Sequence, residues 1–250
     1  RESFKKFINS EDPKSVSDET AIKVKKEIIN ALYPLFSGLL IDMNFGLPAY
    51  KQLTNNSKPY LLPIEKSGFE TVNIDERQNS LEFNAEELKE NGAEGVKILI
   101  YTKPEAENFQ NQVELIKNAY KQAQSVNLPF FFEPVRYDTK APVLECIEKY
   151  LEHGVTADIF KIEAPKDLEE ALGITKALGD TRWILLTRGV TFDQFTSQLE
   201  MAAKGGCSGF LAGRSVWQEY PSLIDDEEKK YFLNDILPSR FKALENIVNQ

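Results

Sequence analysis

Ala157-Asp-Ile-Phe-Lys-Ile-Glu-Ala-Pro165 is a short aliphatic and aromatic stretch that carries a lysine and a glutamate two positions apart. Side chains alternate sides along a strand, so Ile159, Lys161 and Glu163 are expected on one face. An ammonium and a carboxylate in a largely apolar strand are costly to bury unless they are paired or used in chemistry. The stretch therefore predicts a buried strand in which Lys161 is either an amine nucleophile or half of a structural Lys–Glu pair.

Six more runs of similar length flank this stretch at intervals of roughly 20 to 40 residues, and longer amphipathic segments separate them. This alternation is typical of βα units and a parallel sheet. The predicted strands are 38–43, 59–64, 96–101, 129–134, 158–163, 182–187 and 208–212, and the predicted helices are 18–33, 81–91, 108–126, 141–153, 167–178, 191–205 and 225–249.

No linker or low-complexity tract divides the chain, so we predict a single domain over residues 1–250. Eight strands close a βα barrel. Because the sequence starts at Arg1 rather than Met, we expect a (β/α)8 TIM barrel whose first strand lies upstream, with residues 1–9 forming the following helix. An open doubly wound sheet is the alternative, although no Gly-x-Gly-x-x-Gly motif follows the first visible strand. The polar segment 66–79 lacks periodicity and is predicted to be a mobile loop.

Composition argues against several kinds of partner. The net charge is −9 and the lysines are interspersed with acids, which does not favour nucleic-acid binding. No apolar run approaches the roughly 20 residues of a membrane span. Cys146 and Cys207 lack CxxC spacing and fit a reduced, cytoplasmic chain. His153 is the only histidine, so we expect no metal site, no Ser-His-Asp triad and no cofactor.

The working residues of a TIM barrel lie at the C-terminal ends of its strands. Lys97 and Lys161 fall on alternate strands and hence in one layer, where burial and a nearby cation lower the pKa of Lys161 toward the neutral, nucleophilic amine. The alternative for Lys97 is a structural salt bridge with Glu133 or Glu163. Glu133 lies in an aromatic strand, which predicts a raised pKa suited to proton transfer; a buried structural carboxylate is its alternative. Glu163 is expected to position Lys97 or a substrate hydroxyl.

Glycines and arginines follow the last two predicted strands, where barrels often bind phosphate. Glycine permits close approach of a backbone N–H, and arginine offers a two-pronged charged contact. These turns therefore predict a phosphorylated ligand, with Asp42 at the end of the first visible strand as a further candidate contact. The two turns are Thr187-Arg188-Gly189 and Gly213-Arg214.

Several motifs together resemble one enzyme family, the class I tagatose-1,6-bisphosphate aldolases and their relatives the sulfofructosephosphate aldolases. The resemblance runs from Arg1 to about Trp217. The motifs are Ala157-Asp-Ile-Phe-Lys-Ile-Glu-Ala-Pro165, Gly95-Val-Lys-Ile-Leu-Ile-Tyr101, Gly38-Leu-Leu-Ile-Asp-Met-Asn-Phe-Gly-Leu-Pro-Ala49 and Gly209-Phe-Leu-Ala-Gly-Arg-Ser-Val-Trp217.

The resemblance implies that Lys161 forms a Schiff base and that Lys97 and Glu133 assist it. The resemblance also implies that Gly189, Gly213 and Arg214 hold a phosphate, as the corresponding turns do in the family. Two positions depart from the family pattern. Arg1 alone matches the Asp-Gln-Arg that ends the family's first strand, and Arg188 stands where a small residue is usual, which bears on how the anionic end of the substrate is held.

The expected activity is metal-independent cleavage of tagatose 1,6-bisphosphate, or a related ketose phosphate, to dihydroxyacetone phosphate and glyceraldehyde 3-phosphate. A cytoplasmic homo-oligomer in lactose or galactose catabolism fits this resemblance. Phe45-Gly-Leu-Pro-Ala49 is similar to the tagatose enzymes, whereas Glu133-Pro-Val135 is similar to the sulfosugar enzymes, which release sulfolactaldehyde instead. A non-catalytic sugar-phosphate sensor and a phosphosugar isomerase are alternatives from other classes.

Overall fold

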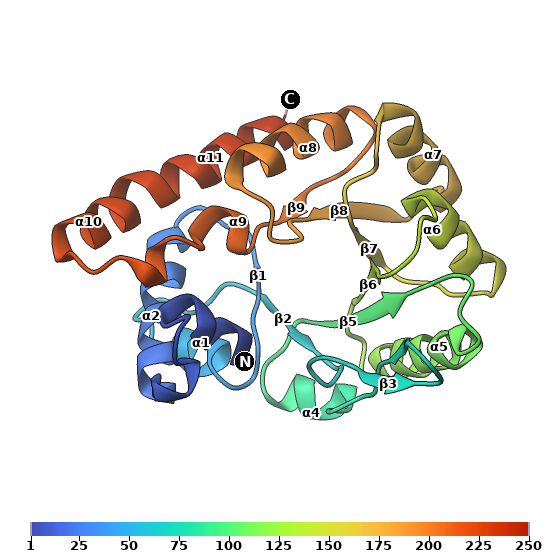
Figure 1. Cartoon of the computed structure of the whole chain (residues 1–250), viewed down its shortest axis with the longest axis horizontal. Helices are drawn as coiled ribbons and strands as arrows, with labels where there is room; N and C mark the ends of the chain where they lie inside the picture. Colours follow the sequence, from blue (N-terminus) through green and yellow to red (C-terminus); the bar gives the residue numbers. More distant parts are fainter. Residues whose placement is uncertain (1, 250) are drawn as a thin grey trace.

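A computed structural model describes residues 2–249. Seven parallel strands form one sheet in the order β1-β2-β5-β6-β7-β8-β9, which follows the chain. Figure 1 shows this sheet curling inside a layer of helices until its edge strands, β1 and β9, approach each other. The strands are β1 Leu39–Leu40, β2 Tyr60–Pro63, β5 Gly95–Thr102, β6 Phe130–Arg136, β7 Ile159–Ile162, β8 Arg182–Leu186 and β9 Phe210–Leu211.

All seven predicted strands are present, and the nearly closed parallel sheet with alternating helices is that of a (β/α)8 TIM barrel. The fold prediction is therefore confirmed. Arg1 and the strand predicted upstream of it lie outside the described residues, so that strand stays a prediction.

Several helices begin where the sequence offers a capping side chain. Ser17, Asp167 and Thr191 each accept a hydrogen bond from the backbone N–H three residues further on, which satisfies a donor at the start of the helix. The helices are α1 Glu2–Ile8, α2 Asp18–Leu32, α3 Gly46–Lys51, α4 Ala85–Glu90, α5 Phe109–Ser125, α6 Val143–Glu152, α7 Leu168–Leu178, α8 Phe192–Lys204, α9 Arg214–Trp217, α10 Asp226–Tyr231 and α11 Leu237–Val248, with 3-10 turns η1 Pro13–Ser15 and η2 Tyr220–Ser222 and a π-helical turn η3 Phe232–Ile236.

The main core lies between the sheet and the helix layer. Phe132 of β6 packs edge to face against Phe160 of β7 and Tyr150 of α6, with ring centroids 5.6 and 4.9 Å apart. Because side chains alternate along a strand, the residues that follow, Glu133 and Lys161, point the opposite way, into the barrel. The same packing that fixes the outer aromatic layer therefore aims the charged side chains inward.

Segment 66–79, predicted to be a mobile loop, contains a short hairpin that lies between α4 and α5 (Figure 1). Its strands are β3 Glu70–Val72 and β4 Glu76–Gln78. The Arg77 guanidinium lies within 5.0 Å of three aromatic ring centroids, those of Phe69, Tyr101 and Tyr137. The hairpin was not visible in the sequence because two of these rings, Tyr101 and Tyr137, belong to other parts of the chain and leave no local periodicity. The mobility of the segment stays a prediction.

Candidate active site

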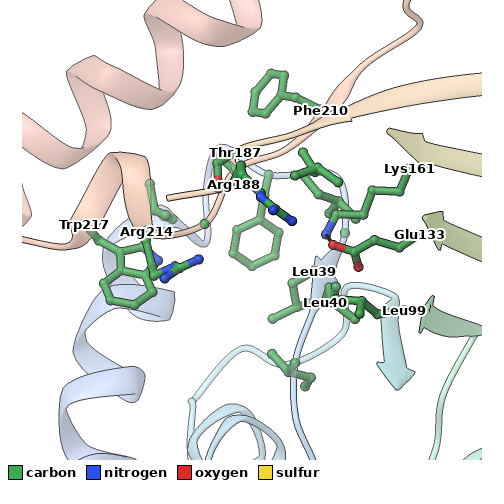
Figure 2. Close-up of a pocket in the computed structure, with 18 of the residues that line it drawn as sticks. Leu39, Leu40, Leu99, Glu133, Lys161, Thr187, Arg188, Phe210, Arg214 and Trp217 are labelled. Carbon is green, nitrogen blue, oxygen red and sulfur yellow. Dashed lines mark hydrogen bonds and ion pairs between the residues drawn. The ribbon is translucent and has the colours of Figure 1, made fainter. Parts of the chain in front are cut away.

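Lys161 of β7 and Glu133 of β6 form an ion pair inside the barrel. Lys161 Nζ lies 2.6 Å from Glu133 Oε1, and the two residues are 8% and 5% exposed. Figure 2 shows the two side chains pointing toward each other on the wall of a pocket of about 600 Å³. The pair is therefore buried from bulk water yet open to a ligand.

Two further buried charges extend this pair. Lys97 Nζ lies 3.5 Å from Glu133 Oε2 and also donates a hydrogen bond to Glu65 Oε1. Glu65 follows β2 and is 8% exposed, and its Oε2 is buried without a hydrogen-bond partner among the described residues. The four side chains alternate in charge, and the group is neutral when all four are ionised.

The two lysines respond differently to this environment. Burial lowers the pKa of Lys161 because it disfavours the ammonium; the Lys97 cation acts in the same direction, and the two outweigh Glu133. Burial also disfavours the Lys97 ammonium, but Glu65 and Glu133 together outweigh it and raise the pKa of Lys97. The prediction that Lys97 lowers the pKa of Lys161 is confirmed, and Lys161 is the amine that loses its proton more readily.

The predicted rise in the pKa of Glu133 is wrong. Burial does favour its neutral form, but the two ammonium groups of Lys161 and Lys97 outweigh burial and lower the pKa. Among the described residues Lys97 is the cation that acts on Glu65, and burial raises the pKa of Glu65 despite it. Glu133 is therefore held as a carboxylate, which is the form that accepts a proton.

Glu163 does not contact Lys97, so that part of its predicted role is wrong. Its Oε2 accepts hydrogen bonds from the backbone N–H and Nε of Arg136 at 2.9 and 3.0 Å, and its Oε1 lies 3.1 Å from Arg188 Nε. Glu163 shares the inward face with Lys161, but two residues of strand advance it by about 6.6 Å toward the mouth. At that level the arginines are its neighbours.

The Gly/Arg turns after β8 and β9 meet on one side of the pocket. Arg188 and Gly189 both have positive φ, 51° and 77°, in a turn that is closed by a 3.1 Å hydrogen bond from the Val190 N–H to the Thr187 carbonyl. A Cβ at Gly189 would lie 2.9 Å from the Arg214 guanidinium carbon, so glycine lets the guanidinium lie against this turn and also favours its positive φ. Thr187, Arg188, Gly213 and Arg214 all line the pocket.

Arg214 is a cation with no acid paired to it among the side chains of residues 4–249. Over the same residues its guanidinium has no hydrogen bond or ion pair, and its neighbours are the Gly189 turn and the Phe7 ring, whose centroid lies 5.9 Å away. Figure 2 shows its nitrogens directed into the pocket. An uncompensated arginine at this place suits an anionic ligand.

Asp42 is not brought to the pocket wall. It lies 2.5 Å from Lys25 Nζ and accepts a hydrogen bond from the Phe45 N–H at 2.8 Å. Burial opposes its charge, but Lys25 and these hydrogen bonds lower the pKa to about 2. Asp42 thus fixes the turn before α3. Contacts of Asp42 and Arg1 with a substrate stay predictions, and Arg1 lies outside the described residues.

A family model of the DeoC/LacD family aldolases matches residues 9–219 of this chain. The chain belongs to the DeoC/LacD aldolase family. It is thus an aldehyde-lyase, as the resemblance of its motifs predicted.

Similar proteins carry related names. The tagatose 1,6-diphosphate aldolase of Listeria monocytogenes serotype 4a (strain HCC23) is 26% identical over 88% of this chain and 75% of its own length. That of Streptococcus agalactiae serotype V (strain ATCC BAA-611 / 2603 V/R) is 28% identical over 83% of this chain and 74% of its own length. Among solved structures, an archaeal fructose 1,6-bisphosphate aldolase matches 98% of this chain and 87% of its own with a TM-score of 0.64 and 19% identity, which shows the shared fold.

Glu65 and Arg136 of this aldolase were missed in the sequence. Both stand one or two residues beyond a predicted strand, after Ile64 and Pro134. Polar side chains within two residues of each predicted strand end therefore include both.

No group of three or more His, Cys, Asp or Glu side chains in the described part of the chain is arranged to hold a metal ion. No helix of residues 2–249 is long and apolar enough to cross a membrane.

Proposed function

We propose that this aldolase is a class I enzyme in which Lys161 forms a Schiff base with the C2 carbonyl of a ketose phosphate. The observation that carries the proposal is the buried Lys161 amine, 2.6 Å from Glu133 on the pocket wall, with a pKa below its ordinary value. Only a neutral amine attacks a carbonyl. The names of the relatives make tagatose 1,6-bisphosphate the first substrate to test.

Glu133 is placed to move each proton of the reaction. It takes a proton from the Lys161 ammonium and, as the freed amine adds to C2, gives that proton to the C2 oxygen. Glu133 then takes a second proton from the added nitrogen and gives it to the C2 hydroxyl, which leaves as water. The resulting iminium draws the electron pair of the C3–C4 bond as Glu133 takes the C4 hydroxyl proton and the aldehyde departs. Protonation of the enamine at C3 and addition of water then release dihydroxyacetone phosphate and free Lys161.

Lys97 and the Gly/Arg turns support this chemistry. The Lys97 cation keeps Glu133 ionised and lowers the pKa of Lys161. Thr187, Gly213 and Arg214 line the same pocket as Lys161, and the unpaired Arg214 guanidinium suits the phosphate beside the ketone. A bound C1 phosphate fixes C2 relative to Lys161, which favours attack through orientation.

Borohydride trapping tests the proposal directly. Incubation with dihydroxyacetone phosphate and borohydride is expected to add the mass of the reduced ligand to Lys161, located by peptide mass spectrometry. Lys161→Met should lose the adduct and at least about 1,000-fold in turnover, because no amine remains at this site to form the iminium. Lys166→Met, which removes an exposed lysine five residues further on, is the matched control and should keep both.

Absence of an adduct in the wild-type chain, or full turnover in Lys161→Met, would refute the Schiff-base proposal. Ligand binding without triose release would favour a sugar-phosphate sensor. Conversion that persists unchanged after borohydride treatment would favour an isomerase, because an isomerase needs no iminium.

A further inference from the structure

Two arginines share one carboxylate at the mouth of the pocket. Glu163 accepts hydrogen bonds from the backbone N–H and the Nε of Arg136, and its other carboxylate oxygen forms an ion pair with the Nε of Arg188. The Glu163 side chain is 8% exposed, whereas that of Arg188 is 46% exposed and lines the pocket. Two guanidinium groups against one carboxylate leave a net charge of +1, so this cluster (Arg136, Glu163 and Arg188) is not neutralised within itself.

Arg188 occupies an unusual backbone position for a long side chain. Its φ of 51° is in the left-handed region, and it is the first central residue of the turn from Thr187 to Val190. Glycine, asparagine and aspartate are the residues that favour such a position. The turn alone therefore does not explain an arginine here, and the side chain itself must supply the reason.

The Arg188 guanidinium is held in place but keeps free donors. Nε contacts Glu163, and one Nη2 hydrogen is donated to the Arg136 carbonyl at 2.8 Å. A guanidinium carries five N–H donors, so three remain. Among the side chains of residues 4–249 and the backbone of 2–249, these three donors have no acceptor. A fixed, half-exposed arginine with free donors on a pocket wall is suited to bind an oxyanion.

Arg188 and Arg214 face different parts of the same pocket. Arg188 reaches back across β7 to contacts at the end of β6, whereas Arg214 leans the other way, toward Phe7 of α1. Figure 2 shows them as two separate guanidinium groups, with the Lys161–Glu133 pair in the same pocket. The pocket therefore offers two cationic contacts that extend in different directions, Arg188 from the turn after β8 toward β6 and Arg214 toward α1.

We infer that Arg188 binds a second anionic group at the far end of the substrate, a terminal phosphate or sulfonate, and so selects doubly anionic ketoses over ketose 1-phosphates. This rests on the proposed function for the assignment of Arg214 to the phosphate beside the ketone. Arg136 and Glu163 are positioning residues in this inference, because they hold the Arg188 guanidinium at the pocket wall.

The test compares substrates that differ only at the far end. Values of kcat/KM are measured for fructose 1,6-bisphosphate, sulfofructose 1-phosphate and fructose 1-phosphate, and the first two are divided by the third. Arg188→Asn is expected to lower these ratios about 10- to 100-fold, the usual effect of a lost charge-assisted contact. Asparagine accepts the left-handed backbone, so the turn is kept. A fall in only one ratio identifies phosphate or sulfonate as the group recognised.

Arg182→Asn is the matched control. It removes the same charge from an exposed residue at the opposite end of β8, and both ratios should stay within about 2-fold, because screening weakens a charge more than a Debye length of about 10 Å away. Ratios that are equal in Arg188→Asn and wild type would overturn the inference. Calorimetry with the same ligands on Lys161→Met gives the selectivity without turnover, so loss of Schiff-base chemistry and loss of anion selection are read separately.

Discussion

The carboxylate of Glu133 acts on Lys161 in two opposite ways. As a neighbouring negative charge it raises the pKa of Lys161 and so holds part of the amine in its unreactive form, against burial and Lys97. As a base 2.6 Å away it can remove the proton that blocks attack. The site therefore combines a lysine whose pKa is lowered by burial with a proton acceptor, Glu133, whose own pKa is kept low by two cations.

Glu133→Gln separates these two effects. Loss of the negative charge lowers the pKa of Lys161 further, so the pH midpoint of borohydride trapping with dihydroxyacetone phosphate should move to lower pH. Turnover should fall about 10²- to 10⁴-fold, because the C4 hydroxyl loses its base. Glu148→Gln, on the exposed face of α6, is the control. A trapping midpoint that moves to higher pH would contradict the arrangement.

Sequence reasoning found the lysines of the site more easily than the state of its carboxylates. Lys97 and Lys161 could be paired because barrel geometry places inward residues of alternate strands in one layer. The sign of the shift at Glu133 could not be predicted, because it depends on two ammonium groups at 2.6 and 3.5 Å rather than on the aromatic strand around it. Glu65 was missed because it stands one residue beyond the predicted end of its strand, at Ile64.

At the scale of the element, the hairpin β3–β4 shows how a loop can be ordered from outside. Arg77 lies 4.4, 5.0 and 4.6 Å from the ring centroids of Phe69, Tyr101 and Tyr137. Tyr101 also lines the active-site pocket. The Tyr101 ring therefore contacts the hairpin on one side and lines the pocket on the other. A change in how the hairpin packs can thus alter the pocket wall.

Arg77→Gln is expected to loosen this hairpin. Each cation–π contact at a partly exposed site contributes about 0.5–1 kcal/mol, so loss of three should raise local opening about 10-fold or more. Native-state proteolysis followed by mass spectrometry should show faster cleavage within residues 66–79, since cleavage follows the open population. Lys66→Gln, an exposed change in the same segment, is the control. Equal cleavage rates in both variants would show that the aromatic contacts do not order the hairpin.

At the scale of the whole molecule, the sheet pairs most extensively between β5 and β6. These two strands pair over seven residues, whereas β6–β7 and the two edge pairs β1–β2 and β8–β9 pair over two each. Helix side chains, Ile28 and Leu32 of α2 and Phe241 of α11, reach the pocket near these edges. We propose, as the sequence predicted, that a further parallel strand upstream of Arg1 pairs between β1 and β9 in the complete barrel.

Amide hydrogen exchange tests whether the outer edge of β1 is unpaired in residues 2–249 and would be paired by the proposed strand. Leu39 and Ile41 donate to the Pro59 and Leu61 carbonyls at 3.1 and 3.2 Å, so the Leu40 N–H between them points away from β2. Leu40 should therefore exchange at least about 100-fold faster than Ile98 in the middle of the sheet, with Leu39 and Ile41 between these limits. In a chain extended upstream through the proposed strand, Leu40 should become protected while Ile98 changes little. Fast exchange of Leu40 in both chains would argue against a strand at this edge, because pairing with β1 requires that N–H as a donor.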